Sequence, residues 1–440
     1  MYNEVNKRIK KLNVRELQRY MMFWLFAKCN RMRKIHIPWW LILSLVLLFS
    51  CSLAEGAQPD TVEALHLTWS QDPMTTQTIT WQTENANENQ FLEYKDVLAT
   101  TSVFHKVVAA VEPFNTDEGL YYIHSVTLEN LIPGHKYVYH IGADSKWNKE
   151  GNFQTESEKT NAFTFLLFGD SQSSDYNEWS KTFGQAVSQT PDTKFFLNVG
   201  DLVDNGQQYT QWKAWFAAIA GYSNQIPVVP VVGNHETYTP IPENKFSLPI
   251  YFTQQFKVEQ NGPEGLKGQV YSFDYGNAHF VILDSQFGEE RKFLPDSLER
   301  QQAWLAQDLA ATDKLWKFVF IHRPAYHNRQ AESLPDPKTA AFIPIFDQYG
   351  VDVVFAGHDH VNKHTLKLKA GMAHAAGTVY MTAGRSGTKS YNTMVAKDWD
   401  AVYLDPAQPT FNVVKIDGNT FTVNVYQQDG TLLDSWRLVK

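Results

Sequence analysis

Five short segments place acidic, amide and imidazole side chains directly after apolar runs of the chain. They are GDSQ (169–172), GDLVDNG (200–206), GNHE (233–236), FIHRPAY (320–326) and GHDH (357–360). The preceding runs are typical of buried strands, and a glycine ends the run in four of the five. Carboxylate, amide and imidazole groups are ligands that divalent and trivalent cations bind in proteins. The segments therefore predict a metal site.

The elements that must position these side chains are strands alternating with helices. Near-continuous apolar runs occupy residues 163–168, 194–199, 227–232, 279–283, 317–321 and 351–356. Apolar residues at helical spacing in 297–312 mark the clearest intervening helix. This alternation predicts an α/β layered domain over residues 157–440, with strands buried on both faces. Because strand carboxyl ends in such sheets meet at one crevice, the five segments are expected to converge.

A different pattern precedes this domain. From about residue 60 to 155, short alternating segments are separated by turn-forming residues, with no helical periodicity. This predicts a β-sandwich of about 100 residues over 58–156. The string LIPGHKYVYHIG (131–142) resembles the late part of a fibronectin type III-like domain. Polar residues 156–161 read as the linker.

The N-terminal segment, residues 1–57, predicts export. An apolar run (37–50) is shorter than the about 20 residues of a membrane-spanning helix. Basic residues precede it and small residues, including Ala54, follow it, which is the pattern of a signal peptide over about 32–54. An uncleaved signal anchor and lipidation at Cys51 are the alternatives. We therefore expect a secreted or cell-envelope protein that touches a membrane only through this segment.

The charge balance excludes some partners. Without residues 1–57, 29 basic and 44 acidic residues remain, a net charge of −15. So acidic a chain binds nucleic acid and anionic membranes poorly, and we expect no nucleic-acid partner. The two cysteines, Cys29 and Cys51, both precede the exported part, which therefore carries no disulfide framework.

The five segments resemble the sequence blocks of the calcineurin-like metallophosphoesterases, over about residues 160–440. With the preceding sandwich, the resemblance is to the purple acid phosphatase branch. The segment GTVYMTAGRSGTKSY (377–391) is similar to the strand and turn that follow the last histidine block in bacterial members. The resemblance implies an αββα sandwich behind the N-terminal β-sandwich.

The resemblance also implies a dinuclear metal centre that activates a water for in-line attack on a small phosphomonoester. In that reading Asp201 bridges two divalent or trivalent ions. Asp170 and His360 complete much of the first ion's shell. The second ion is held by Asn234, His322 and His358.

Further residues take roles beside the metals. The resemblance assigns His235 to protonation of the leaving group or to the charged transition state. Asp204 would orient His235, and an Asp–His hydrogen bond would raise the basicity of the histidine. The alternative role of Asp204 is to cap the segment that follows it. Arg323 is a candidate phosphate ligand or half of a surface ion pair. Asp359 is expected only to turn its loop.

The chain departs from the family pattern at two positions. Purple acid phosphatases have a coloured iron–tyrosinate where this chain has Asp204, so we expect no purple colour. Generic members have a histidine where this chain has Gln172. Gln172 would be a weaker metal ligand than histidine, or a residue that contacts the ligands without binding the metal. Mn, Fe or Mg then becomes an expected occupant beside Zn. Residues 237–268 form an insertion that is expected to overhang the cleft.

Several functions remain open at the level of sequence. A phosphodiesterase or nucleotidase would use the same residues as a phosphomonoesterase. A catalytically silent surface protein is the alternative from another class, although the intact set of ligand-type residues argues against it. A membrane-tethered structural protein would explain the N-terminal segment and none of the five blocks.

Overall fold

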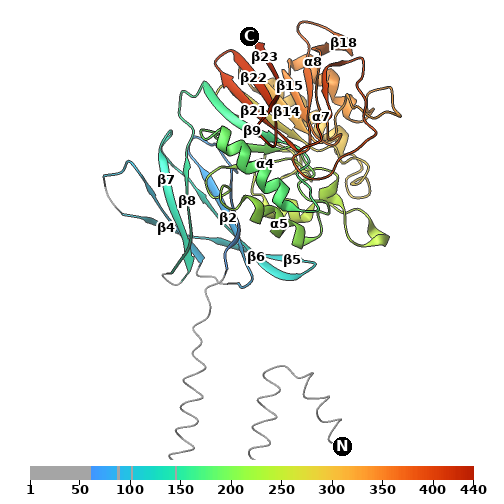
Figure 1. Ribbon diagram of the computed structural model, residues 1–440. Coiled ribbons are helices and arrows are strands. Elements are labelled where there is room, and N and C mark those ends of the chain that lie inside the picture. Colours follow the sequence, from blue (N-terminus) through green and yellow to red (C-terminus); the bar gives the residue numbers. More distant parts are fainter. Residues whose placement is uncertain (1–60, 87–89, 101–102, 144–145) are drawn as a thin grey trace, which may run out of the picture. The chain divides into compact units, whose positions relative to one another are not determined.

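The computed structural model describes residues 61–440 apart from 87–89, 101–102 and 144–145 (Figure 1). The predicted signal peptide or anchor lies outside the described residues. No helix within the described part of the chain is long and apolar enough to span a bilayer.

The first eight strands form the predicted β-sandwich. Two antiparallel four-stranded sheets have the strand orders β1-β2-β6-β5 and β4-β3-β7-β8. Between them lies a core that includes Trp81, Leu92 and Tyr139. The strands are β1 (Glu63–Thr68), β2 (Gln77–Thr83), β3 (Gln90–Asp96), β4 (His105–Val108), β5 (Ala110–Thr116), β6 (Gly119–Leu128), β7 (Lys136–Ala143) and β8 (Lys146–Gln154).

Two larger sheets build the rest of the molecule. The six-stranded sheet has the order β11-β10-β9-β21-β22-β23. Its strands are β9 (Ala162–Phe168), β10 (Phe196–Asn198), β11 (Val228–Pro230), β21 (Thr410–Asp417), β22 (Thr420–Gln427) and β23 (Leu432–Val439). The C-terminal strands β21, β22 and β23 thus continue this sheet beyond β9, because β21 pairs with β9 (Figure 1).

The seven-stranded sheet has the order β12-β13-β14-β15-β19-β16-β20. Its strands are β12 (Tyr271–Tyr275), β13 (Ala278–Leu283), β14 (Trp316–Ile321), β15 (Val353–Ala356), β16 (Asn362–Thr365), β19 (Val379–Ala383) and β20 (Asp400–Leu404). A small separate hairpin consists of β17 (Leu368–Lys369) and β18 (Met372–Ala373).

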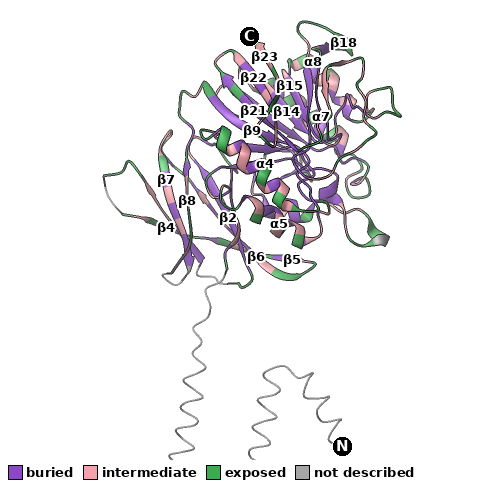
Figure 2. Ribbon diagram, in the orientation of Figure 1, coloured by how far each residue is buried: buried purple, intermediate pink, exposed green. Residues whose placement is uncertain are grey.

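Helices cover the outer faces of the two sheets, which gives the predicted αββα sandwich. They are α4 (Tyr176–Gln189), α5 (Tyr209–Ile219), α6 (Ile250–Gln255), α7 (Ser297–Ala311) and α8 (Ile343–Tyr349). Short 3-10 turns are η1 (His235–Thr237), η2 (Pro242–Asn244) and η3 (Thr339–Phe342). Figure 2 shows β9, β14, β15 and β21 largely buried in the middle of these layers.

The near-continuous apolar runs are explained by burial on both strand faces. Because strand side chains alternate, Phe318 and Phe320 of β14 enter the core between the sheets. Val319 and Ile321, the residues between and after them, pack in the cluster under α7 and α8. A parallel strand covered on both sides has no polar face, so the sequence shows no alternation.

The N-terminal sandwich packs against α5 and the insertion at 237–268. Tyr209 Oη donates to Gln82 Oε1 at 2.5 Å, and Gln82 Nε2 donates to Gln255 Oε1 at 2.9 Å. Thr68 Oγ1 also donates to the carbonyl of Lys257 at 2.5 Å. The later part of the insertion, expected over the cleft, therefore joins the sandwich to the rest of the molecule.

Candidate metal centre

Side chains from five strand ends converge at one place. Strands β9, β10 and β11 are parallel to one another, as are β13, β14, β15 and β19, so their carboxyl ends share an edge within each sheet. The residues that follow these ends are Asp170, Asp201, Asn234 with His235, His322, and His358 with His360. The structure brings this predicted set together.

The backbone bends sharply at four of these residues. Asp170, Asp201, His358 and His360 have φ angles of 49°, 54°, 68° and 58°. Positive φ is unfavourable for residues with a Cβ and persists only where surrounding contacts enforce it. Such concentrated strain at one place is typical of a functional site.

Two glycines of the motifs are required because side chains from other strands approach their backbone closely. A Cβ on Gly357 would lie 2.7 Å from Asp170 Oδ2, and one on Gly200 would lie 2.5 Å from His322 Nδ1. Gly200 also has a φ of +94°. Each of these glycines therefore makes room for a functional side chain that comes from another strand.

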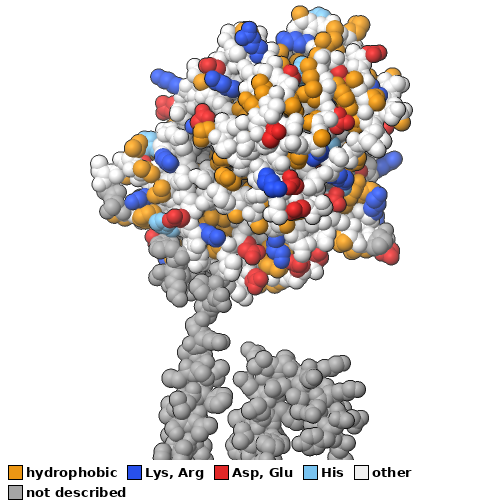
Figure 3. Space-filling view, viewed as in Figure 1, with side chains coloured by type: hydrophobic (Ala, Val, Ile, Leu, Met, Phe, Trp, Pro, Cys, Tyr) orange, Lys and Arg blue, Asp and Glu red, His pale blue; other side chains and the backbone are white. Residues whose placement is uncertain are grey.

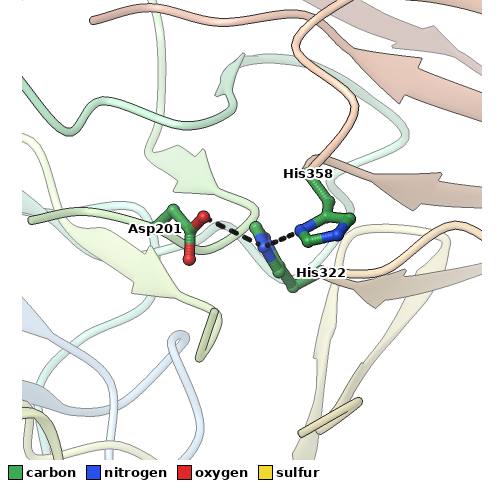
Figure 4. Close-up of side chains that lie close together, drawn as sticks. All are labelled: Asp201, His322 and His358. Atoms are coloured by element: carbon green, nitrogen blue, oxygen red, sulfur yellow. Dashed lines mark hydrogen bonds and ion pairs between the residues drawn. The ribbon is translucent and has the colours of Figure 1, made fainter. Parts of the chain in front are cut away.

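The first group of candidate ligands is centred on His322. Its Nε2 lies 3.3 Å from Asp201 Oδ2, 3.2 Å from His358 Nδ1 and 3.1 Å from Asn234 Oδ1. Figure 4 shows the imidazole of His322 between the carboxylate of Asp201 and the ring of His358. Ligand atoms of Asp201, His322 and His358 all lie within 4.8 Å of one another.

The second group shares Asp201 with the first. Ligand atoms of Asp170, Asp201 and His360 lie within 4.8 Å of one another, and His360 Nε2 is 3.2 Å from Asp170 Oδ1. Gln172 Nε2 is 3.5 Å from the same His360 nitrogen. The side-chain oxygen of Gln172 is buried and has no hydrogen-bond partner among the described residues. A buried amide next to His360, with its oxygen unpaired, fits a place among the candidate metal ligands.

Hydrogen bonds from outside the site fix the orientation of two histidine rings. Nδ1 of His322 lies 2.8 Å from the carbonyl of Val199, and Nδ1 of His360 lies 2.7 Å from the carbonyl of Lys389. A carbonyl only accepts, so each Nδ1 carries a proton. Nε2 of the neutral ring therefore presents its lone pair to the site, as a metal ligand must.

The electrostatics of the cluster follow from burial and close pairing. Burial opposes the charge of Asp201, but His322 and His235 outweigh it and hold its pKa well below the usual value. Burial likewise opposes the charge of His322, yet Asp201 raises its pKa to about 9. Burial and the positive charge of His322 lower the pKa of His358. Without metal, a proton on His322 thus balances the carboxylate of Asp201.

Glu236 braces the loops that carry these ligands. Its carboxylate accepts backbone N–H groups of Asp201 at 2.9 Å, Leu202 at 2.8 Å and Gly233 at 2.7 Å. Burial and Asp201 raise the pKa of Glu236 to about 8, against the effect of the N–H donors. The last residue of the GNHE motif therefore ties the loop after β10 to the loop after β11.

His235 lies next to the cluster and is buried. Its Nε2 is 3.9 Å from Asp201 Oδ2 and 2.9 Å from Lys389 Nζ. Its Nδ1 is 2.6 Å from the carbonyl oxygen of Asp204 and 3.3 Å from Asp204 Oδ1. Asp204 thus contacts His235 as predicted, with its backbone oxygen closer than its carboxylate.

Two other predicted residues have specific partners. Arg323 donates from Nη1 and Nη2 to the two oxygens of Glu289, at 2.9 and 2.7 Å, in a bidentate ion pair. Asp359 does more than turn its loop: it is buried, and its Oδ2 accepts the backbone N–H of Asn328 at 2.7 Å. Asp359 therefore fastens the 357–360 loop to the segment after β14.

Sequence reasoning missed Lys389 and Tyr391, which come from the loop after β19. The ring of Tyr391 lies 4.4 Å from that of His360. Ser386 and Gly387 of this loop donate backbone N–H groups to the carbonyls of Gly169 and Asp170, at 2.7 and 3.1 Å. The segment GRSGTKSY combines turn glycines with a lysine, which is a recognisable sequence signal. That this segment lies close to the candidate ligands depends on the tertiary fold.

Comparisons with known proteins agree with this geometry. The sequence profile for the calcineurin-like phosphoesterase family matches residues 163–362, and that for the N-terminal domain of purple acid phosphatase matches 62–155. A purple acid phosphatase of Glycine max is 28% identical over 302 residues, which cover 62% of this chain and 61% of the relative. The aligned part is thus less than two thirds of the soybean protein.

Another relative aligns over more of its length. Acid phosphatase type 7 of Mus musculus is 24% identical over 402 residues, covering 82% of this chain and 87% of the relative. Among solved structures, purple acid phosphatase PPD1 from seeds of yellow lupin (Lupinus luteus) superimposes with a TM-score of 0.73 at 19% identity. That match covers 86% of this chain and 74% of the lupin chain. It supports the two-part architecture described above.

Proposed function

The chain belongs to the calcineurin-like metallophosphoesterases and carries the N-terminal domain of purple acid phosphatases; from this premise, we propose that it is an exported, metal-dependent phosphomonoesterase with a dinuclear centre. The observation that carries the proposal is the pair of candidate ligand groups that share Asp201, with the buried amide of Gln172 next to His360 of one group. Two ions that share a carboxylate suit a phosphoryl group, whose oxygens need charge on more than one side.

We assign the ligands by these two groups. One ion would be held by Asp170, Asp201, His360 and Gln172, and the other by Asp201, Asn234, His322 and His358. When bound, the ions supply positive charge to the phosphoryl oxygens and an acidified water as nucleophile. Because an amide oxygen is a harder and weaker ligand than imidazole, Gln172 favours Mn, Fe or Mg over Zn at its site.

The remaining roles belong to side chains of the chain itself. For His235 to protonate the leaving oxygen, its Nε2, which accepts from Lys389 Nζ in the structure, must first gain a proton, while its Nδ1–H stays bonded to the carbonyl of Asp204. That second bond prevents the ring from turning away during proton transfer. Lys389, next to His235 Nε2, adds a positive charge on the side where the phosphoryl group would lie.

Local positive charge matters because residues 58–440 carry a net charge of −15. The face shown in Figure 3 has acidic and basic side chains interspersed, without a basic patch. An anionic substrate would therefore be captured at the site itself by metal ions and by the lysine and arginine side chains around it.

The export part of the proposal rests on residues 32–54, with cleavage after Ala54. Mass spectrometry of the protein recovered from its producing cells tests it. A mature chain beginning at Glu55 supports a cleaved signal, and an intact N-terminus in the membrane fraction supports the anchor.

The enzymatic proposal is tested by metal content and hydrolysis in the same preparations. The purified protein, reconstituted with Mn, Fe, Zn or Mg, should hold about two ions per chain and hydrolyse 4-nitrophenyl phosphate. Asp201→Asn should lose most of both properties, and Glu243→Gln, on the exposed turn η2, serves as the charge-matched control. Faster hydrolysis of bis(4-nitrophenyl) phosphate would favour a diesterase. Absence of bound metal under every condition would favour the silent binding protein.

A further inference from the structure

A cavity of about 310 Å³ adjoins the candidate metal centre. His358, which we assign to the second ion, forms part of its wall, so the cavity opens beside the metal ligands. Its volume is at the lower end of the range for small-molecule pockets. A phosphoester bound at the centre can therefore extend its alcohol part into this space.

Three basic side chains line the cavity, and all come from the segment between β14 and η3. Arg323 follows β14, Arg329 lies six residues further on, and Lys338 immediately precedes η3. Two acidic residues, Glu289 and Asp336, lie in the same wall. The wall therefore has an excess of one positive charge in a chain whose overall charge is negative.

The partners of the two arginines hold them in place. Arg323 is bound at both nitrogens by Glu289, and its side chain is only 18% exposed. Arg329 Nη1 lies 3.2 Å from Glu332 Oε1, and among the described residues its guanidinium forms no second ion pair. A planar guanidinium held by one carboxylate can still accept a second anion at its other edge.

Lys338 is the least compensated of the three cations. Asp336 is nearby in sequence, but its Oδ1 accepts the backbone N–H groups of Lys338 at 3.1 Å and Thr339 at 3.0 Å and the hydroxyl of Thr339 at 3.1 Å. That carboxylate is thus used to begin η3. In the described part of the chain the Lys338 ammonium forms no ion pair within 4.0 Å, although its positive charge contributes to lowering the pKa of Glu289, which Arg323 already binds. Its Nζ reaches over the wall, 3.8 Å from where a Cβ on Gly288 would lie.

We propose that this cavity binds a second anionic group on the alcohol part of the substrate, and that Lys338 and Arg329 recognise it. The inference rests on the proposed function and deepens it. It assigns the enzyme to phosphomonoesters whose alcohol also carries a carboxylate or another phosphate. The scissile phosphoryl group lies at the ligand cluster, and the second anion lies between Lys338 and Arg329.

Matched substrate pairs test this directly. One pair is 3-carboxyphenyl phosphate and its neutral analogue 3-carbamoylphenyl phosphate, and the other is propane-1,3-diol bisphosphate and 3-hydroxypropyl phosphate. The wild-type protein should show a higher kcat/KM for the charged member of each pair, by about five- to tenfold at low salt. The preference should shrink as ionic strength rises. A preference within one pair alone tells whether carboxylate or phosphate is the group recognised.

Variants separate the cavity from the general charge of the protein. Lys338→Met should lower kcat/KM for the charged members and bring the ratio within each pair towards one, and Arg329→Gln should act in the same direction. Lys149→Met removes the same charge from an exposed position on β8 and should leave both ratios unchanged.

The outcomes distinguish the two proposals. Hydrolysis of both members of each pair at equal rates, or a preference that survives Lys338→Met and Arg329→Gln together, would overturn the cavity assignment and leave the phosphomonoesterase intact. No hydrolysis of any monoester by the metal-loaded protein would overturn the proposed function and the cavity assignment with it.

Discussion

Lys389 Nζ lies 2.9 Å from Nε2 of His235 and 3.1 Å from Oδ1 of Asp204. An ammonium group only donates hydrogen bonds, so Nε2 of His235 accepts here and the ring proton lies on Nδ1, against the carbonyl of Asp204. The backbone carbonyl of Lys389 also accepts the Nδ1–H of His360. One residue thus contacts both the proposed general acid and a proposed metal ligand, through different groups.

Replacing Lys389 should therefore affect the chemical step. Lys389→Met keeps the backbone bond to His360 and removes the ammonium, and we expect kcat to fall by about 10- to 100-fold with metal content retained. Lys389→Arg should restore part of the loss, because it restores the charge. Steady-state kinetics on a neutral aryl phosphate measure this, with Lys369→Met on β17 as the exposed control. An unchanged kcat would mean that Lys389 forms only a surface ion pair with Asp204.

Gly357 provides a test of the packing between strand ends. Gly357→Ala would place a Cβ 2.7 Å from Asp170 Oδ2, so the carboxylate or the 357–360 loop must move. We expect a loss of about 1–3 kcal/mol in the free energy of unfolding, as for overpacked cores, and a lower metal stoichiometry. Gly221→Ala is the matched control, since nothing lies within 4 Å of its added Cβ. Full metal occupancy in Gly357→Ala would contradict the close approach.

His279 should make stability depend on pH. Burial opposes its charge, but Asp274 at 2.7 Å and Asp308 at 2.8 Å raise its pKa to about 9. The folded protein therefore holds a proton that the unfolded chain releases near pH 6.5. The stabilisation is complete below about pH 6.5 and is lost as the pH rises through 9. Because Asp274 is half exposed, we expect about 2 kcal/mol.

Urea unfolding of the wild type and of His279→Gln at pH 6 and pH 10 measures this contribution. The difference in unfolding free energy between the two proteins should be larger at pH 6. His374→Gln, at an exposed position, should show no such trend. A difference that grows with pH would show that the sign is wrong.

Iron should not give this protein a purple colour. Position 204, where the coloured relatives have tyrosine, is Asp204. A phenol next to the candidate ligands, Tyr391, packs on His360 with its pKa raised by burial, which favours the protonated form. We therefore expect no tyrosinate-to-iron(III) absorption band in the iron-loaded protein, and the same spectrum for Tyr391→Phe. A visible band that disappears in Tyr391→Phe would instead identify Tyr391 as an iron ligand.

The fold and the ligand cluster were predictable because both depend on local patterns. Continuous apolar runs such as 317–321 indicate strands covered on both sides, and parallel strand ends must meet at one edge. The environment of the ligands was less predictable. Lys389 contacts His235, and Glu289 contacts Arg323, from loops that are distant in sequence. No local sequence pattern indicates these contacts. The contacts of residues 250–257 with the sandwich also depend on tertiary packing.

The position of β9 also affects how the protein is made. Its two neighbours are β10, which follows closely, and β21, which begins at Thr410, about 240 residues after β9 ends at Phe168. A nascent chain has synthesised the entire ligand set before the second neighbour of β9 leaves the ribosome. At ordinary translation rates one edge of the strand stays unpaired for on the order of tens of seconds, open to aggregation or to chaperones. For a chain proposed to be exported, that delay would keep the nascent protein unfolded long enough to be threaded through a translocation channel.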